Sequence, residues 1–224
     1  MTCDLEMHEG VMFANVDGQK LLIDTGSPLS FANRDIVING TEHEVSRELM
    51  GHTADQLSEK IGFGTDGLIG ADILQRYDLA IDYRRKTLLF SSDLDPNGTR
   101  IPLHSVMGFP YGVTLEFQGN SLSCYLDTGA SICHLPLEEN GTLTYLKEYH
   151  DFNPILGEFT TPLYAGEVFL EGLRVSVRAG KMVQSLESKL SLMGVDGVLG
   201  IDLFREFRVI FRPEESVMYM MEHS

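Results

Sequence analysis

Two aspartates in this chain follow short apolar runs and begin the same tripeptide. Asp24 lies in "LLIDTGSPLS", and Asp127 lies in "CYLDTGASIC". Two carboxyl groups held about 3 Å apart cannot both ionise, so one acts as a general base while the other keeps a proton and acts as a general acid. The paired motif therefore predicts acid–base chemistry, provided that the fold brings both aspartates to one place.

A longer repeat surrounds these aspartates. The 25-residue segment from Asp66 aligns without a gap with the segment from Asp196, "DGLIGADILQRYDLAIDYRRKTLLF" against "DGVLGIDLFREFRVIFRPEESVMYM". The Asp-Thr-Gly copies are 103 positions apart and these segments are 130 apart, so the second copy carries 27 additional residues. Such a repeat predicts two related lobes, residues 1–94 and 99–224, joined by the turn-rich "SSDLDPNGTR".

Local patterns predict an all-β fold with few short helices. Strand-length apolar runs occur at 21–23, 36–38, 88–90 and 209–211, and Asn-Gly hairpin signals occur at 39–40, 97–98 and 140–141. Short helices are expected after Gly70 and Gly200, and "TADQLSEKIG" also has helical spacing. The acids predicted to cap the helices after the two glycines are Asp66, Asp72, Asp196 and Asp202.

Composition excludes several classes of partner. The formal net charge of −16 argues against nucleic acid and against anionic membrane surfaces. Three cysteines without paired spacing predict neither a disulfide framework nor a metal site, and we expect no cofactor. The N-terminal "MTCDLEMHEG" lacks the pattern of a secretory signal, and no apolar window is long enough to span a membrane. These features predict a cytoplasmic protein or a soluble part of a larger one.

Over nearly its whole length the chain resembles the retropepsin- and pepsin-like aspartic peptidases. The resemblance rests on two motif pairs: Asp24-Thr25-Gly26 with Leu68-Ile69-Gly70, and Asp127-Thr128-Gly129 with Val198-Leu199-Gly200. It implies a bilobal acid-protease fold whose lobes are related by a pseudo-two-fold axis, with the active-site cleft between them. It also implies an endopeptidase that acts on peptide or protein substrates as a monomer, because one chain supplies both lobes.

The resemblance assigns roles to individual residues. Asp24 and Asp127 would activate a water molecule that hydrolyses the peptide bond. The residues that would support the two catalytic loops are Thr25, Gly26, Ser27, Thr128, Gly129 and Ala130. By the family's pattern the threonines hydrogen-bond across the lobe interface, and the glycines let backbone N–H groups approach the inner carboxyl oxygens.

The two loops differ at the residue after the glycine. A hydroxyl that donates to a carboxylate favours its charged form, and Ser27 could do this for Asp24. Ala130 offers no hydroxyl, although Ser131 follows it and could compensate. We therefore predict that Asp24 holds the charge of the pair and that Asp127 holds the proton.

The additional residues of the second lobe fall where the family has a β-hairpin flap over its substrate. Residues 158–180, "EFTTPLYAGEVFLEGLRVSVRAG", show strand-like alternation, and we predict a flap that places Tyr164, Ala165 and Gly166 over the two aspartates. The first lobe has only a short candidate around Asn39-Gly40. The alternative is an extra surface hairpin away from the cleft.

Two other functions compete with peptide-bond hydrolysis. One is a catalytically inactive peptide-binding module that retains the cleft, and the other is a structural or regulatory partner that uses the acidic surface. Both Asp-Thr-Gly copies are intact, whereas a decayed enzyme is expected to lose one. This observation favours the enzyme.

Overall fold

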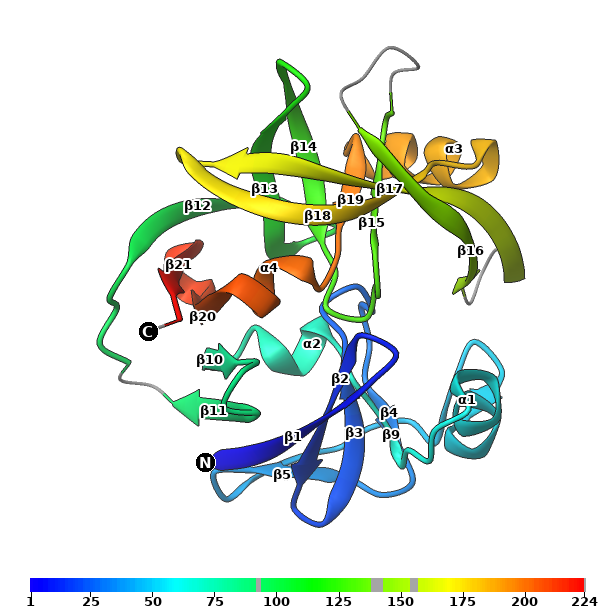
Figure 1. Ribbon diagram of the computed structural model, residues 1–224. Coiled ribbons are helices and arrows are strands. Elements are labelled where there is room, and N and C mark those ends of the chain that lie inside the picture. The colour runs from blue at the N-terminus through cyan, green and yellow to red at the C-terminus, as the bar shows by residue number, and fades with distance from the viewer. Residues whose placement is uncertain (92–93, 138–142, 154–156, 224) are drawn as a thin grey trace.

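The computed structural model describes residues 1–91, 94–137, 143–153 and 157–223 (Figure 1). Within these ranges the chain forms 21 strands, and this confirms the predicted mostly β composition with few short helices. The helices are α1 (Ala54–Ile61), α2 (Ala71–Leu74), α3 (Gln184–Met193) and α4 (Asp202–Glu206), with a 3₁₀ turn at Pro213–Glu215. The sequence patterns predicted α1, α2 and α4 but not α3.

The first strand group is built from the N-terminal part of the chain. Its main sheet contains β1 (Thr2–His8), β2 (Val11–Val16), β3 (Gln19–Ile23), β4 (Phe31–Ala32) and β9 (Gly67–Ile69). Two small hairpins accompany it, β5 (Ile36–Ile38) with β6 (Thr41–His43) and β7 (Glu48–Leu49) with β8 (His52–Thr53). Strand β3 runs parallel to β9, so Ile23, the residue directly before Asp24, lies opposite Ile69.

The second strand group repeats this arrangement and extends it. Its strands are β13 (Phe109–Phe117), β14 (Asn120–Leu126), β15 (Cys133–Leu135), β16 (Thr144–Asn153), β17 (Gly157–Leu170), β18 (Leu173–Lys181) and β19 (Gly197–Leu199). Strand β14 runs parallel to β19, so Leu126, the residue directly before Asp127, lies opposite Leu199. The antiparallel strands β16, β17 and β18 are much longer than the hairpins at the corresponding place in the first group, and they take up the additional residues of the second copy.

A central antiparallel sheet joins the two groups. Its order is β1, β11 (Thr87–Ser91), β10 (Asp78–Asp82), β20 (Phe207–Arg212), β21 (Val217–Glu222) and β12 (Thr99–Val106). Strands β10 and β20 meet at its middle, where Ala80 lies opposite Ile210. These residues are equivalent positions in the repeat, 130 apart in sequence. The two copies of the repeat therefore meet through equivalent strands, β10 and β20, which run antiparallel to each other.

Local sequence explains the turns that set up these strands. The β2–β3 and β13–β14 hairpins turn at Asp17-Gly18 and Gln118-Gly119, with φ angles of 50° and 72° and of 49° and 82°. Positive φ at both positions gives the two-residue turn that matches the twist of paired strands. Helix α1 begins with a reciprocal capping box between Thr53 and Gln56 and ends at a left-handed Gly62.

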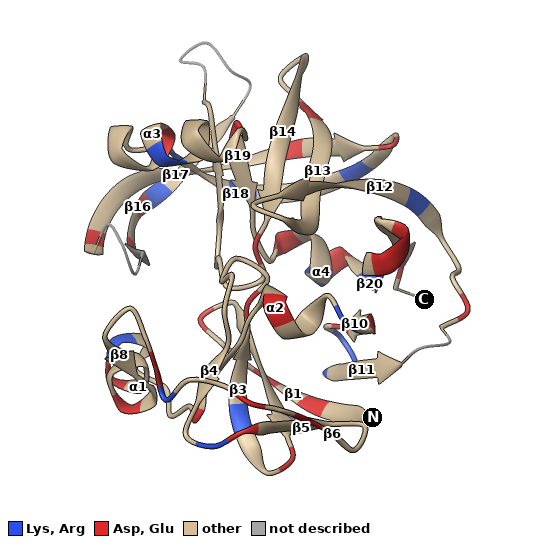
Figure 2. Ribbon diagram, turned by 180° about the vertical axis from the view of Figure 1, so that it is seen from behind, with Lys and Arg blue, Asp and Glu red and all other residues tan. Residues whose placement is uncertain are grey.

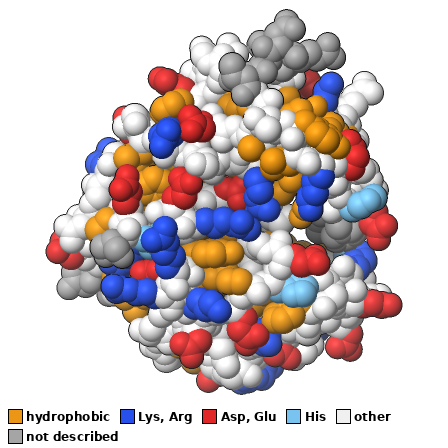
Figure 3. Space-filling view, viewed as in Figure 1, with side chains coloured by type: hydrophobic (Ala, Val, Ile, Leu, Met, Phe, Trp, Pro, Cys, Tyr) orange, Lys and Arg blue, Asp and Glu red, His pale blue; other side chains and the backbone are white. Residues whose placement is uncertain are grey.

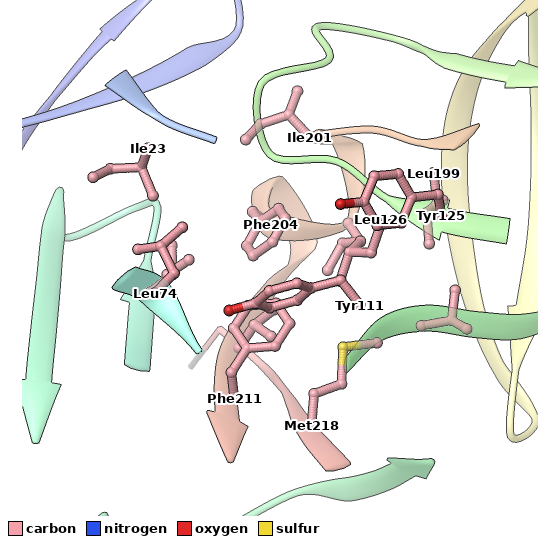
Figure 4. Close-up of a cluster of buried hydrophobic side chains, with 14 of the residues drawn as sticks. Ile23, Leu74, Tyr111, Tyr125, Leu126, Leu199, Ile201, Phe204, Phe211 and Met218 are labelled. Atoms are coloured by element: carbon pink, nitrogen blue, oxygen red, sulfur yellow. The ribbon is translucent and has the colours of Figure 1, made fainter. Parts of the chain in front are cut away.

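Side chains from both strand groups share one apolar core. Figure 4 shows Ile23 and Leu74 of the first group near Tyr111, Phe204 and Phe211. The rings of Tyr111 and Phe211 pack edge to face, with centroids 5.8 Å apart. Because Ile23 belongs to this cluster and directly precedes Asp24, the packing fixes the position from which the Asp24 loop starts.

The aspartates near α2 and α4 do not cap these helices, so the capping prediction is wrong. The N-cap residues are Gly70 and Ile201, and neither offers a side-chain cap. The N-cap positions fall between the aspartates, because Asp66 and Asp196 precede β9 and β19, whereas Asp72 and Asp202 already lie in the first turn of α2 and α4. In the first group, Asp72 instead accepts a hydrogen bond of 2.6 Å from the Ser30 hydroxyl.

The aspartates that open the repeated 25-residue segments tie strands together. Asp66 accepts a hydrogen bond of 2.9 Å from the Lys20 N–H, and Asp196 accepts one of 2.8 Å from the Ser123 N–H. Lys20 and Ser123 are themselves equivalent positions, 103 apart. Both acids therefore join the start of β9 or β19 to the parallel strand that leads to the motif aspartate.

The three Asn-Gly pairs have different outcomes. Asn39-Gly40 forms the β5–β6 turn, as predicted, but the Asn39 amide donates to the Phe90 carbonyl at 3.3 Å and so places this hairpin beside the central sheet. Asn97-Gly98 lies in the connection before β12 and forms no hairpin. Residues 140–141 lie outside the described ranges.

Charge is distributed unevenly over the surface. Acidic residues occur in both strand groups (Figure 2), whereas Lys and Arg side chains gather across the middle of the face seen in Figure 3.

Among the described residues, none of the helices has both the length and the apolar character needed to cross a membrane.

Candidate active site

Each motif aspartate begins a loop that is held by the apolar-apolar-Gly segment of the same strand group. The Asp24 N–H donates to the Ile69 carbonyl at 3.0 Å, and the Asp127 N–H donates to the Leu199 carbonyl at 2.9 Å. The segments that follow Asp66 and Asp196 in sequence therefore anchor both loops in the same way.

The far ends of the two loops are held by the helices. The Ser27 carbonyl accepts a hydrogen bond of 2.8 Å from the Ala71 N–H, and the Ala130 carbonyl accepts one of 3.0 Å from the Ile201 N–H. Each loop is thus fixed at its start by a strand and at its end by the first residues of α2 or α4.

The two threonines join the loops to each other. The Thr25 hydroxyl donates to the Leu126 carbonyl at 2.7 Å, and the Thr128 hydroxyl donates to the Ile23 carbonyl at 2.7 Å. Each hydroxyl also accepts the other threonine's N–H at 3.0 Å. Both threonines are buried, with exposed fractions of 1% and 0%. The hydrogen bonds that were predicted for Thr25 and Thr128 between the two loops are therefore confirmed.

The glycines allow the two carboxyl groups to face each other. The Gly26 N–H donates to Asp24 Oδ1 and the Gly129 N–H donates to Asp127 Oδ1, both at 2.8 Å. A Cβ atom at Gly129 would lie 2.6 Å from the Asp24 Cγ atom, and one at Gly26 would overlap the whole Asp127 carboxyl group. Each carboxyl group therefore lies against the opposite loop, where only glycine leaves enough room.

This environment favours protonation of the pair. Burial raises the pKa of Asp24 well above its ordinary value, and the nearby charge of Asp127 raises it further. Burial also raises the pKa of Asp127, although the Gly129 N–H opposes this shift. Because the carboxyl groups hydrogen-bond to each other, they share a proton that belongs to the pair. Such a pair offers one base and one acid at the same point.

Ser27 and Ala130 support their loops through the backbone, as predicted, but the Ser27 hydroxyl does not act on Asp24. The Ser27 hydroxyl donates to the Leu29 carbonyl at 2.8 Å, and only the Ser27 N–H reaches Asp24, at 3.0 Å. Ala130 supports its loop through its backbone. The premise that a serine hydroxyl places the charge on Asp24 is therefore wrong, because a local turn takes up that hydroxyl.

The predicted flap residues lie within the three-stranded part of the second group. On β17, Tyr164 pairs with Tyr145 of β16, and their rings pack with centroids 5.8 Å apart. Ala165 and Gly166 pair with Arg178 and Val177 of β18. These contacts join the residues to neighbouring strands, and a position over the aspartates stays a prediction for all three.

Strand β16 contacts the Asp127 loop, and no pattern in the sequence predicts this contact. The Tyr149 hydroxyl lies 2.8 Å from Ser131 Oγ, four positions after Asp127. Asp151 lies 2.9 Å from Nε2 of the buried His134. No short spacing in the sequence marks these pairs, since each joins residues 17 or 18 positions apart.

An ion pair between a partly exposed arginine and a buried carboxylate fixes the same loop from β18. Arg178 contacts Asp202 Oδ1 at 2.7 Å and also donates to the Ser131 carbonyl at 2.7 Å. The Asp202 side chain is only 4% exposed. Asp202 therefore orients an arginine instead of capping α4, and this arginine holds the segment just beyond Asp127.

Other chemistries have little support among the side chains of the described ranges. These residues include no group of three or more His, Cys, Asp or Glu side chains that could hold a metal ion. Cys3, Cys124 and Cys133 are buried and free.

Comparison with known proteins adds no family to this geometry, because neither a family model nor a curated protein sequence matches the chain. The paired carboxyl groups and the residues that hold them are therefore the basis for the function proposed below.

Proposed function

We propose that this chain is an aspartic endopeptidase with two retropepsin-like lobes, residues 1–94 and 99–224, related by a pseudo-two-fold axis. The observation that carries the proposal is the pair of facing carboxyl groups of Asp24 and Asp127 in loops that hydrogen-bond to each other. A pair of acids that merely capped turns would need neither the mutual threonine bonds nor glycines at the point of closest approach.

The repeat geometry supports the two-lobe interpretation. Ala80 and Ile210 are equivalent in sequence and lie opposite each other in the central sheet, as a local two-fold axis requires. The hydrogen bonds around Asp24 and Asp127 also recur in matched pairs. Since one chain carries both halves of the site, the proposed enzyme works as a monomer.

The proposed reaction adds water to a peptide carbonyl. The ionised carboxylate takes a proton from the water, and the oxygen of that water bonds to the carbonyl carbon. The protonated carboxyl group donates its proton to the carbonyl oxygen at the same time, so a neutral tetrahedral diol forms. Its collapse breaks the C–N bond, with a proton transferred to the leaving nitrogen. The dyad ends with one proton, as it began, and no cofactor enters the balance.

The test is cleavage of a denatured protein across acid and neutral pH by the wild type and four variants. Asp24→Asn and Asp127→Asn should each reduce the rate by about three orders of magnitude or more, and the double variant should be little worse, because the acids act as a unit. Asp55→Asn changes an exposed aspartate in α1 and should have no effect. The specific rate should not depend on protein concentration.

Two results would overturn the proposal. Near-normal cleavage by a folded Asp24→Asn or Asp127→Asn variant would exclude a shared dyad. A wild type that cleaves nothing but binds peptides and a transition-state-mimicking inhibitor would support the peptide-binding module instead.

A further inference from the structure

One buried tyrosine crosses from the second strand group into the first catalytic loop. Tyr125 lies on β14, two positions before Asp127, and is 3% exposed. Its hydroxyl donates to the Thr25 carbonyl at 2.6 Å. Figure 4 shows its ring among the buried side chains between the two groups. This contact is not part of the threonine bonds, and no motif in the sequence indicates it.

The accepting carbonyl belongs to the peptide that holds Asp24. The Thr25 carbonyl and the Gly26 N–H are opposite ends of one planar unit. The Gly26 N–H donates to Asp24 Oδ1 at 2.8 Å. A donor on the carbonyl fixes the orientation of this plane and polarises it, which strengthens the N–H at its other end. The contact with Tyr125 is therefore relayed to the Asp24 carboxyl group.

Among the residues that the structure describes, the second catalytic loop has no tyrosine hydroxyl at the corresponding place. Gly129 holds Asp127 Oδ1 with its N–H at 2.8 Å, as in the first loop. The position equivalent to Tyr125 is Leu22, which has no hydroxyl. The two halves of the site are alike in their threonines and glycines but differ in this contact.

We propose that Tyr125 is a positioning residue of the dyad, which orients and polarises the Thr25–Gly26 peptide so that its N–H stabilises the ionised form of Asp24. The catalytic part of this inference rests on the proposed function. Its electrostatic part does not, because the titration of the dyad can be measured whether or not the chain cleaves peptides.

Other charged groups also face the dyad and stay in place when the tyrosine hydroxyl is removed. His134 lies close enough that its charge lowers the pKa of Asp127. Burial lowers the pKa of Lys189 on α3, while the Asp127 charge opposes that shift. Tyr125 itself stays neutral, because burial and the charges of Asp127 and Asp24 raise its pKa. The loss of its hydroxyl therefore removes a hydrogen bond and no charge.

The chain offers a matched control. Tyr111 is also fully buried, at 0% exposure, and its hydroxyl has no hydrogen-bond partner among the described residues. Its ring packs against Phe211. Tyr111→Phe and Tyr125→Phe are therefore the same chemical change at two buried sites, and only the second removes a hydrogen bond to a catalytic loop.

The experiment titrates the protein with ¹³C-labelled aspartate carboxyl groups by NMR. Wild type, Tyr125→Phe and Tyr111→Phe are compared, and Asp24→Asn and Asp127→Asn assign the dyad signals. An apparent pKa of the dyad should rise in Tyr125→Phe, because its carboxylate form is held less well, and should not change in Tyr111→Phe. Thermal unfolding of the variants shows that each is folded at the pH values used.

A kinetic measurement on the same variants gives the second readout. In Tyr125→Phe, kcat should fall by about threefold to tenfold with KM unchanged, since the tyrosine touches no substrate and one hydrogen bond is lost. Dyad pKa values in Tyr125→Phe that equal those of wild type, or that Tyr111→Phe changes equally, would overturn the inference. Absent cleavage by wild type would count against the proposed function alone, while the titration would still decide the role of Tyr125.

Discussion

Replacement of Thr25 by valine tests whether the two loops depend on their mutual hydrogen bonds. Valine keeps the shape of threonine but removes a donor to the Leu126 carbonyl at 2.7 Å and an acceptor for the Thr128 N–H at 3.0 Å. Two buried backbone groups would lose their partners, at about 1–3 kcal/mol each. The free energy of unfolding should fall by about 2–6 kcal/mol, a large part of the roughly 5–15 kcal/mol typical of a folded protein.

The assay is urea unfolding followed by circular dichroism, because the chain contains no tryptophan for fluorescence. Thr25→Ser keeps the hydroxyl and should cost only about 1 kcal/mol for the lost methyl group. Thr114→Val, at an exposed position on β13, should change stability by less than about 0.5 kcal/mol. Equal losses for Thr25→Val and Thr25→Ser would refute the reasoning, since the hydroxyl would then contribute nothing.

Three further predictions concern the surroundings of the dyad. Asp127→Asn should stabilise the chain at neutral pH. Because the pKa of Asp127 is raised in the folded state, ionisation of this carboxyl group makes the folded protein less stable as pH rises from the ordinary aspartate range through the raised pKa. In urea unfolding the gain in the free energy of unfolding should become smaller on acidification, and a gain independent of pH would contradict this. Gly26→Ala should abolish cleavage, since its methyl group would overlap the Asp127 carboxyl, whereas Gly64→Ala adds a methyl group in open space and should leave the cleavage rate unchanged. Arg178→Met should lower the free energy of unfolding by about 1–3 kcal/mol, because the buried Asp202 carboxylate loses its nearest cationic partner and keeps Arg205 at 3.5 Å. Arg174→Met removes an exposed ion pair and should cost less than about 1 kcal/mol, so equal losses for the two arginines would contradict the assigned role.

The loops that begin at Asp24 and Asp127 could be predicted in detail because their parts are encoded by short motifs. The strand before Asp24, the hydroxyl of Thr25 and the missing side chain of Gly26 occupy adjacent positions, and the repeat places a matching set around Asp127. Within such a segment the chain itself fixes the spacing. The repeat then implied that the two sets meet, and the hydrogen bonds between the loops agree with this.

The surroundings could not be predicted, because they depend on contacts between distant segments. Arg178 reaches Asp202 and Ser131 across 24 and 47 positions, and no spacing rule links such residues. The flap prediction had a different limit. Alternation of apolar and polar residues with period two shows which face of a strand is buried. The same alternation continues along the whole strand, so it does not show which end of a hairpin points toward a site. For this reason residues 158–180 could be predicted as strands, whereas the position of Tyr164 could not be derived.

The four threonine hydrogen bonds also determine when the site can exist. They join residues 101 to 105 positions apart, whereas the β2–β3 and β13–β14 hairpins close through two-residue turns. Closing a long chain segment costs more conformational entropy than closing a short one, so local hairpins form first and distant contacts form last. While the chain is being synthesised, Asp24 is in place long before residues near Thr128 have been added. Any activity that needs both acids therefore begins only after most of the chain has folded.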